Sequence, residues 1–119
     1  SPVYKGQYYP SDSAANQGYG SSIAINGDYY IVGAPLSSSS GSTSNREGSV
    51  YIHRFSDEKY EREIIASDGE NYDHFGSVVA SDGNYILVSA DGNDENGDFA
   101  GAVYLYKLDD PTFERKILV

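Results

Sequence analysis

The sequence predicts an all-β repeat protein with two four-stranded antiparallel units and one additional strand at its N-terminal end. Residues 19–35 return at 75–91 without a gap, at a constant offset of 56 residues. A second shared stretch, 48–55, returns at 101–108, so only the loop between the two stretches changes length. Self-similarity at a period of about 50 residues is typical of repeat architectures. Tyrosine, which favours strands, occurs 12 times, and no amphipathic run long enough for a helix interrupts the pattern.

Composition restricts the classes of protein to consider. A chain of 119 residues forms one ordinary domain at most. A net charge of −10 and a pI near 4.3 disfavour binding to nucleic acid and to anionic membrane surfaces, and no apolar run is long enough for insertion into a membrane. The absence of cysteine excludes a disulfide framework and a thiolate metal site. The absence of methionine predicts a processed product or an excised fragment, from which any signal peptide has been removed.

The repeat offset divides the chain into three parts. Residues 4–9 align with residues 60–65 at the same offset of 56, which predicts that they form the last strand of a preceding unit. We therefore expect residues 1–18 to hold that strand and a linker, residues 19–65 to form the first unit, and residues 66–119 to form a linker and the second unit.

Each unit is expected to contain four strands. The first strand is rich in Ser, Ala, Val and Ile, and it ends at Asn26-Gly27 or Asp82-Gly83, the strongest short hairpin signals. The second is a nearly continuous apolar run, as expected where both faces are buried. The third alternates Val50 and Ile52 with aromatic residues, so both of its faces need cover as well. The fourth alternates apolar and charged residues, which is typical of a protected edge strand. The expected strands are 21–25, 29–34, 49–55 and 60–65 in the first unit, and 77–81, 85–90, 102–108 and 113–118 in the second.

The order of these motifs resembles a known family. An aromatic-Gly dipeptide, an apolar strand that ends in Gly-Ala-Pro and a following Gly-Ser-Val-Tyr are similar to the FG-GAP repeat, which builds the β-propeller of integrin α-chains. In the second copy, Ser89-Ala90-Asp91 replaces Gly-Ala-Pro. The linker 66–76 resembles the one that joins units of the shorter FG-GAP subtype. The residues that carry the structural motif are Tyr19, Gly20, Gly33, Ala34, Pro35, Phe75 and Gly76.

The resemblance implies two propeller-type blades, preceded by an extra N-terminal strand from another blade. Integrin repeats often carry a calcium loop between the aromatic-Gly strand and the Gly-Ala-Pro strand, but this chain has only tight turns there. That calcium site is therefore not transferred to this protein. Propellers have about four to eight blades, so we expect further blades or further copies of the chain to complete the assembly.

Three groups of residues are candidates for a site. The acidic loop after the second unit's apolar strand alternates oxygen ligands and could hold Ca²⁺, or it could be a solvated acidic loop. The aspartates of the inter-blade loops are expected to bind backbone amides, with a functional role as the alternative. His53 and His74 have no recurring carboxylate beside them, so we expect packing or loop roles and no enzyme activity. The candidate metal ligands are Asp91, Asn93, Glu95 and Asp98, and the inter-blade loop residues are Asp12, Asp68 and Asp73.

These observations predict a non-catalytic module with an adhesion or scaffold surface, located outside the cell or at the cell surface. Its contacts would come from the loops 36–47 and 91–100, and its partners would be other blades, other copies of itself, or a protein or glycan ligand. One alternative is self-assembly into a ring or filament, in which residues 4–9 add a strand to a neighbouring chain. The other is a calcium-dependent module that binds a ligand or carbohydrate.

Overall fold

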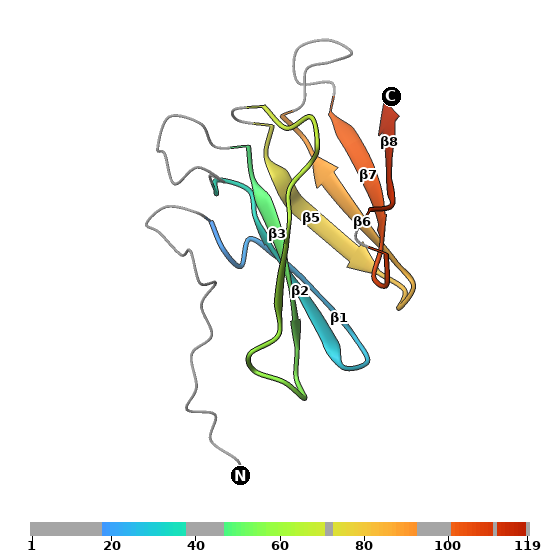
Figure 1. Ribbon diagram of the computed structural model, residues 1–119. Helices are drawn as coiled ribbons and strands as arrows, with labels where there is room; N and C mark the ends of the chain where they lie inside the picture. The colour runs from blue at the N-terminus through green and yellow to red at the C-terminus, as the bar shows by residue number, and fades with distance from the viewer. Residues whose placement is uncertain (1–17, 38–46, 71–72, 93–100, 111, 119) are drawn as a thin grey trace.

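The protein consists of two four-stranded antiparallel β-sheets, as a computed structural model shows (Figure 1). The structure describes residues 18–37, 47–70, 73–92, 101–110 and 112–118. No helix occurs in these ranges, so the all-β prediction is confirmed. The predicted strand at residues 4–9 lies outside the described residues.

The strands follow the predicted order in both sheets. The first sheet has the order β1-β2-β3-β4 and the second has the order β5-β6-β7-β8, so the fourth strand of each unit lies at an edge, as expected. Most strand ends lie within a residue or two of the predicted positions. The first sheet contains β1 (Ser22–Asn26), β2 (Tyr29–Ala34), β3 (Ser49–Arg54) and β4 (Glu61–Ile64). The second contains β5 (Phe75–Ser81), β6 (Tyr85–Ala90), β7 (Ala102–Lys107) and β8 (Glu114–Leu118).

The first strand of the second unit differs from the prediction because it begins at its aromatic residue. β5 starts at Phe75, which pairs with Ala90, and an irregularity separates this pair from the regular ladder that resumes at Val79. A bulge bends a strand and changes which way its side chains point. Here residues 76–78 lie outside the regular ladder, and Phe75 also forms a bridge to Gly48 of the first unit.

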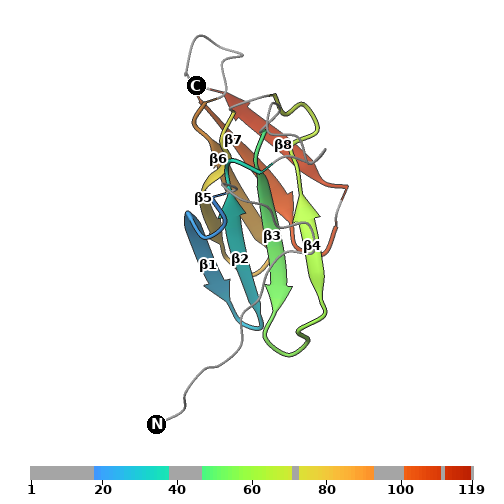
Figure 2. The same cartoon turned by 90° about the vertical axis from the view of Figure 1, so that its left-hand side faces the viewer.

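The two sheets stack face to face, and β5 is the strand through which they meet. It contacts β1, β2 and β3 of the first sheet. In Figure 2 the first sheet crosses the view from β1 to β4, with the second sheet behind it. We call the face of the second sheet that packs on the first sheet, and the equivalent face of the first sheet, the N-face, and the opposite face of each sheet its C-face. The core therefore lies between the C-face of the first sheet and the N-face of the second.

Strand register shows which side chains fill this core. The first sheet supplies Ile31, Val50, Ile52 and Ile64, and the second supplies Phe75, Val79, Ile86, Val88, Tyr104 and Tyr106, all of them buried. Both sheets thus contribute one face to a single apolar layer, whose burial is the main favourable term for the stacking.

The second strands of the two units differ in burial. β2 is buried over its last four residues, as a run covered on both faces should be. In β6, exposed or half-buried side chains alternate with buried ones, so its C-face is open in this chain, where the sequence predicts cover by a further unit or a further copy. The cause is the arrangement of the sheets, because the second sheet has a neighbour on its N-face alone among the described residues.

Candidate functional site

The aromatic-Gly dipeptide of the second unit inserts into the first sheet at two glycines. A Cβ atom on Gly33 would lie 2.0 Å from the carbonyl oxygen of Gly76, and one on Gly48 would lie 2.2 Å from that of Phe75. Gly76 itself has φ of 100° and passes close to the Ser49 carbonyl. Only residues without a side chain allow two backbones to approach so closely. We call this contact the glycine junction; it comprises Gly33, Gly48, Phe75 and Gly76.

Polar contacts extend the glycine junction along the two sheets. The Ser22 hydroxyl donates to the Gly76 carbonyl at 2.9 Å, and the backbone N–H of Phe75 donates to the Glu47 carbonyl at 3.1 Å. At the far end, Arg62 Nη1 donates to the Leu108 carbonyl at 3.0 Å. These bonds satisfy backbone groups that a simple stacking of sheets would leave without partners in the core. They also fix the position of the second sheet along the first.

Equivalent aromatic residues pack against equivalent strands in the two units. The Phe75 ring makes edge-to-face contacts with Tyr104 and Tyr106, at centroid distances of 5.3 and 5.9 Å. The Tyr19 ring makes the same kind of edge-to-face contact with Tyr51, at a centroid distance of 5.7 Å. Such pairs contribute about 0.5–1.5 kcal/mol beyond the burial of their area. Phe75 is fully buried, whereas Tyr19 is half-buried.

In the first unit, the aromatic residue of the dipeptide also forms a side-chain hydrogen bond, which Phe75 of the second unit cannot form. Tyr19 Oη and His53 Nε2 lie 3.0 Å apart, at the positions held by Phe75 and Tyr106 in the second unit. Burial raises the pKa of Tyr19 to about 12, so the phenol stays protonated. Burial also lowers the pKa of His53, despite the nearby charge of Glu61, so its neutral imidazole is favoured. The pair is a neutral, structural contact, which fits the packing role expected for His53.

The linker before β5 is bound to the second sheet through side chains. Asp68 accepts hydrogen bonds from the Tyr104 hydroxyl at 2.7 Å and from Lys116 Nζ at 2.6 Å. Burial alone would raise the pKa of Asp68, but the bonds from Lys116 and Tyr104 together outweigh it and lower that pKa. The other predicted inter-blade residue, Asp73, is buried and accepts from the backbone N–H of Glu70 at 2.9 Å. Asp12 lies outside the described residues.

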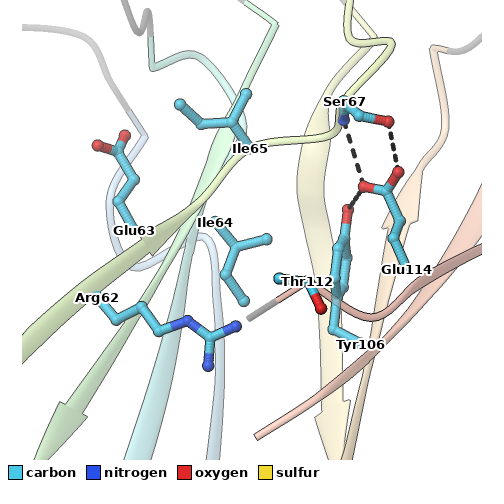
Figure 3. Close-up of a pocket in the computed structure, with 8 residues that line it drawn as sticks. All are labelled: Arg62, Glu63, Ile64, Ile65, Ser67, Tyr106, Thr112 and Glu114. Atoms are coloured by element: carbon cyan, nitrogen blue, oxygen red, sulfur yellow. Dashed lines mark hydrogen bonds between the residues drawn. The ribbon is translucent and has the colours of Figure 1, made fainter. Parts of the chain in front are cut away.

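A hollow of about 410 Å³ opens between β4 and the second sheet (Figure 3). On one side, Glu114 accepts hydrogen bonds from the Ser67 backbone and hydroxyl and from Tyr106. Burial and the neighbouring Glu114 raise the pKa of Tyr106 well above its usual range, so Tyr106 remains a donor. The residues that line the hollow are Arg62, Glu63, Ile64, Ile65, Ser67, Tyr106, Thr112 and Glu114. None of these lining residues is a histidine or a cysteine. The Ser67 hydroxyl therefore has a carboxylate partner but no imidazole base in this hollow, and the network stabilises the linker.

The predicted calcium ligands are described only at Asp91. Its carboxylate lies 3.0 Å from His74 Nδ1, and the backbone N–H of Gly92 donates to the Asp73 carbonyl. Asn93, Glu95 and Asp98 lie outside the described residues, as do most of the loops 36–47 and 91–100. In the part of the chain that the structure does describe, no three histidine or acidic side chains are grouped closely enough to hold a metal ion. Calcium binding therefore stays a prediction.

The remaining motif residues lie at the ends of the first sheet. The backbone N–H of Gly20 donates to the Gly33 carbonyl at 3.0 Å, which attaches the first aromatic-Gly dipeptide to its own sheet. Ala34 is buried, and its carbonyl accepts from the Ser37 N–H in the turn that contains Pro35. Among the described residues, nothing lies within 4 Å of the Cβ position of Gly20. The first aromatic-Gly dipeptide thus has no counterpart of the glycine junction in the described chain.

Sequence reasoning missed the polar residues that connect the two units. The alternating pattern of the fourth strands predicts only edge-strand charges at Arg62 and Lys116, but Arg62 donates to the Leu108 carbonyl and Lys116 donates to Asp68. Ser22 was assigned only to a strand of small residues. The recurrence of Glu61 as Glu114 and of Arg62 as Arg115, at the 53-residue offset of the second shared stretch, is the signal that the sequence offers, although it does not identify the partners.

Comparison with known proteins identifies the repeated motif. A family profile described as FG-GAP repeat matches residues 7–53 and again residues 59–106. The two matches cover most of the chain and confirm the resemblance inferred from its aromatic-Gly and Gly-Ala-Pro motifs. No curated protein matches the chain. Among the described residues, no helix has the length and apolarity needed to cross a bilayer.

Proposed function

Because the chain belongs to the FG-GAP repeat family, we propose that it is a non-catalytic scaffold or adhesion module of an extracellular or cell-surface protein. FG-GAP repeats are a non-catalytic repeat type, support a β-propeller-like module and typically occur in surface proteins. In this proposal the sheet faces join the two units to neighbouring units, and the assembled surface carries the contacts with partners.

The exposure of apolar side chains on the C-face of the second sheet supports this proposal most directly. Leu87, Val103 and Ile117 are exposed on that face. On the N-face of the first sheet, by contrast, Val32 and Tyr51 are buried, and Ile23 and Ile25 of the edge strand β1 are exposed. Exposed apolar patches mark interaction surfaces in soluble proteins, and repeat proteins bury such faces by stacking neighbouring units.

The absence of cysteine makes the proposal testable by single-cysteine labelling. We would place one cysteine at Leu87, on the open C-face, and another at Lys59, in the exposed turn between β3 and β4. Both variants would be produced in the native host and treated on intact cells with a membrane-impermeant maleimide. The proposal predicts strong labelling at position 59, because that turn faces the medium, and protection at position 87, because a neighbour covers it.

The isolated 119-residue chain, diluted until it is monomeric, is the matched control and should be labelled at both positions. Absence of labelling at position 59 on intact cells would contradict the extracellular location. Equal labelling at both positions on cells would contradict the scaffold role, because the apolar face would then be uncovered in the working protein.

A further inference from the structure

The C-face of the second sheet lacks the glycine by which the first sheet admits its neighbour. Ser89 stands where the first sheet has Gly33, and a Cβ atom on Gly33 would lie 2.0 Å from the Gly76 carbonyl oxygen. The Ser89 hydroxyl also lies 2.7 Å from the hydroxyl of Ser77 on the neighbouring strand. A further unit therefore cannot bring an aromatic-Gly dipeptide as close to this face as Phe75-Gly76 comes to the first sheet.

Two polar contacts between the units also have no counterpart on this face. Ser22 Oγ and Asn26 Nδ2 donate to backbone carbonyls of the second unit, at 2.9 and 3.3 Å. Their equivalents at the repeat offset are Val78 and Asp82. A valine side chain has no donor and an ionised carboxylate only accepts, so neither residue can form the equivalent bond to a further unit. The face is therefore suited to a different kind of neighbour.

Apolar and aromatic side chains are nevertheless exposed on this face, and all four strands contribute them. Their exposed fractions lie between 37% and 60%. These residues are Val78, Tyr85, Leu87, Val103 and Ile117. The same face has a hollow of about 360 Å³, and the residues that line it are Ala80, Ser81, Asp82, Tyr85, Leu87 and Leu105. Exposed patches of this kind mark interaction surfaces in soluble proteins.

Two opposite charges lie on opposite sides of this face. Asp82 follows β5, the strand at one edge, and its Oδ1 accepts bonds from the backbone N–H groups of Tyr85 and Asn84 at 2.9 and 3.0 Å. These bonds lower the pKa of Asp82 and keep its carboxylate charged. Arg115 belongs to β8, the strand at the other edge, and its guanidinium stacks on the Phe113 ring at 4.5 Å. A partner with the reverse arrangement of charge would match both sides.

The strand order makes a second copy of this face such a partner. A two-fold axis parallel to the strands, between β6 and β7, places β5 of one copy over β8 of the other and β6 over β7. Each cross-strand row then lies over the same row of the second copy. In this arrangement Val78 faces Ile117, and Leu87 faces Leu105, its own neighbour in register. Two sheets commonly stack with their strands aligned in this way.

We propose that the C-face of the second sheet binds the same face of a second copy of the chain in a closed two-fold dimer. The inference rests on the proposed function, since it names the neighbour that covers the face. In the dimer, Arg115 of each copy extends over the hollow of the other copy and pairs with Asp82 at its rim. Because each copy supplies both members of this pair, the interface contains it twice. The contact uses the same surface of both copies, so it closes at the dimer and builds no filament.

The first test is the solution mass of the 119-residue chain by sedimentation equilibrium, from micromolar to millimolar concentration. The mass should rise from 12.9 kDa toward twice that value and stop there. Leu87→Glu should weaken dimerisation about thirtyfold, or about 2 kcal/mol, because it places a charge in the apolar centre of the contact. Ile23→Glu is the matched control, since it makes the same kind of change on the exposed part of β1 and should leave dimerisation unchanged. Circular dichroism of each variant verifies that it is folded.

The second test exchanges the charges of the pair. Arg115→Asp should weaken dimerisation about tenfold, because two carboxylates then meet, and Asp82→Arg should do the same, because two guanidinium groups meet. An equimolar mixture of these two variants should dimerise as tightly as the wild-type chain, because each variant supplies the charge that the other needs. A mixture that stays monomeric while the wild-type chain dimerises would overturn the two-fold geometry.

A further variant keeps this test decisive if Asp82→Arg does not fold. Asp82→Asn installs the Asn-Gly turn of the first unit and so preserves the hairpin signal. Added to Arg115→Asp, it should recover part of the lost affinity, because it removes one carboxylate from each repulsive pair. No recovery would show that the two side chains do not meet in the dimer.

The two proposals can fail separately. A wild-type chain that is monomeric at millimolar concentration overturns the dimer, and a mass that keeps rising past the dimer overturns its closed geometry. If Leu87→Cys is nevertheless protected on intact cells while the isolated chain is monomeric, the scaffold role stands and a different protein or a further unit covers that face.

Discussion

The glycine junction forms on the C-face of the first sheet, whereas the equivalent C-face of the second sheet makes no such contact among the described residues. At the junction, Gly33 and Gly48 admit the backbone of Phe75-Gly76, and Ile31 is completely buried. On the C-face, Ser89 replaces the first of these glycines and Leu87 remains exposed. The difference shows that the repeat motif encodes a contact between units as well as the fold of one unit. A side chain at position 33 would prevent the close approach of Gly76 that joins the two sheets.

The largest effect on stability is expected when the aromatic residue of an aromatic-Gly dipeptide is replaced by alanine. Phe75→Ala should lower the free energy of unfolding by about 4 kcal/mol, because it removes a fully buried ring from the core between the sheets. Tyr19→Ala should cost about 2 kcal/mol, because that ring is half-buried and has no second sheet over it. Denaturant unfolding of both variants measures the difference. Equal losses would mean that the glycine junction does not add to the stability of the aromatic residue.

The next effect concerns the glycine that the second unit lacks. Gly33→Ser should destabilise the chain by about 3 kcal/mol, because its Cβ would overlap the Gly76 carbonyl and force the sheets apart. Ser89→Gly, the reverse change on the open face, is the matched control and should cost less than about 1 kcal/mol. Thermal and denaturant unfolding at low protein concentration would measure both. A small loss for Gly33→Ser would show that the sheets can separate at little cost.

The sequence distance between interacting residues determines how much of the fold and of the site could be predicted from the sequence. Strand positions and hairpins depend on neighbouring residues, so the alternation of side chains and the signals at Asn26-Gly27 and Asp82-Gly83 were sufficient. Repetition also identified the motif glycines. It did not reveal that Gly33 and Gly76 need each other, because their contact depends on how two sheets stack. The bonds of Asp68 to Tyr104 and Lys116 join positions 36 and 48 residues apart, and no local pattern marks them.

A smaller effect is expected at the linker. Asp68→Asn should lower the free energy of unfolding by about 1 kcal/mol, because the carboxylate accepts bonds from Tyr104 and Lys116 while partly exposed to solvent. The folded-state pKa of Asp68 lies below its usual value, so this contribution is present above that value and is lost as the pH falls through the lowered pKa. Unfolding of wild type and variant across acidic pH should therefore converge at low pH. The exposed Asp109→Asn is the control, and an equal loss there would contradict the role of Asp68.

The smallest effect on stability is expected from the protonation of His53, because the second unit has Tyr106 at the equivalent position. Burial lowers the folded-state pKa of His53, so the unfolded chain binds a proton more readily and stability falls as the pH drops below about 6.5. The loss should stay within about 1 kcal/mol between about pH 7 and pH 5. His53→Tyr, which installs the residue of the second unit, should flatten this part of the profile. Thermal unfolding of both proteins over this range provides the measurement, and parallel profiles would show that another group titrates.

The central claim is that the two sheets are joined through the glycine junction, and backbone amide chemical shifts of the Gly33→Ser variant test it most directly. Relative to the wild-type chain, shifts should change at Phe75 and Gly76 and along β2 and β5, because a side chain at position 33 overlaps the Gly76 carbonyl. Amides in the turn at Lys59 should stay constant. Changes confined to the first sheet, with β5 unaffected, would contradict the claim.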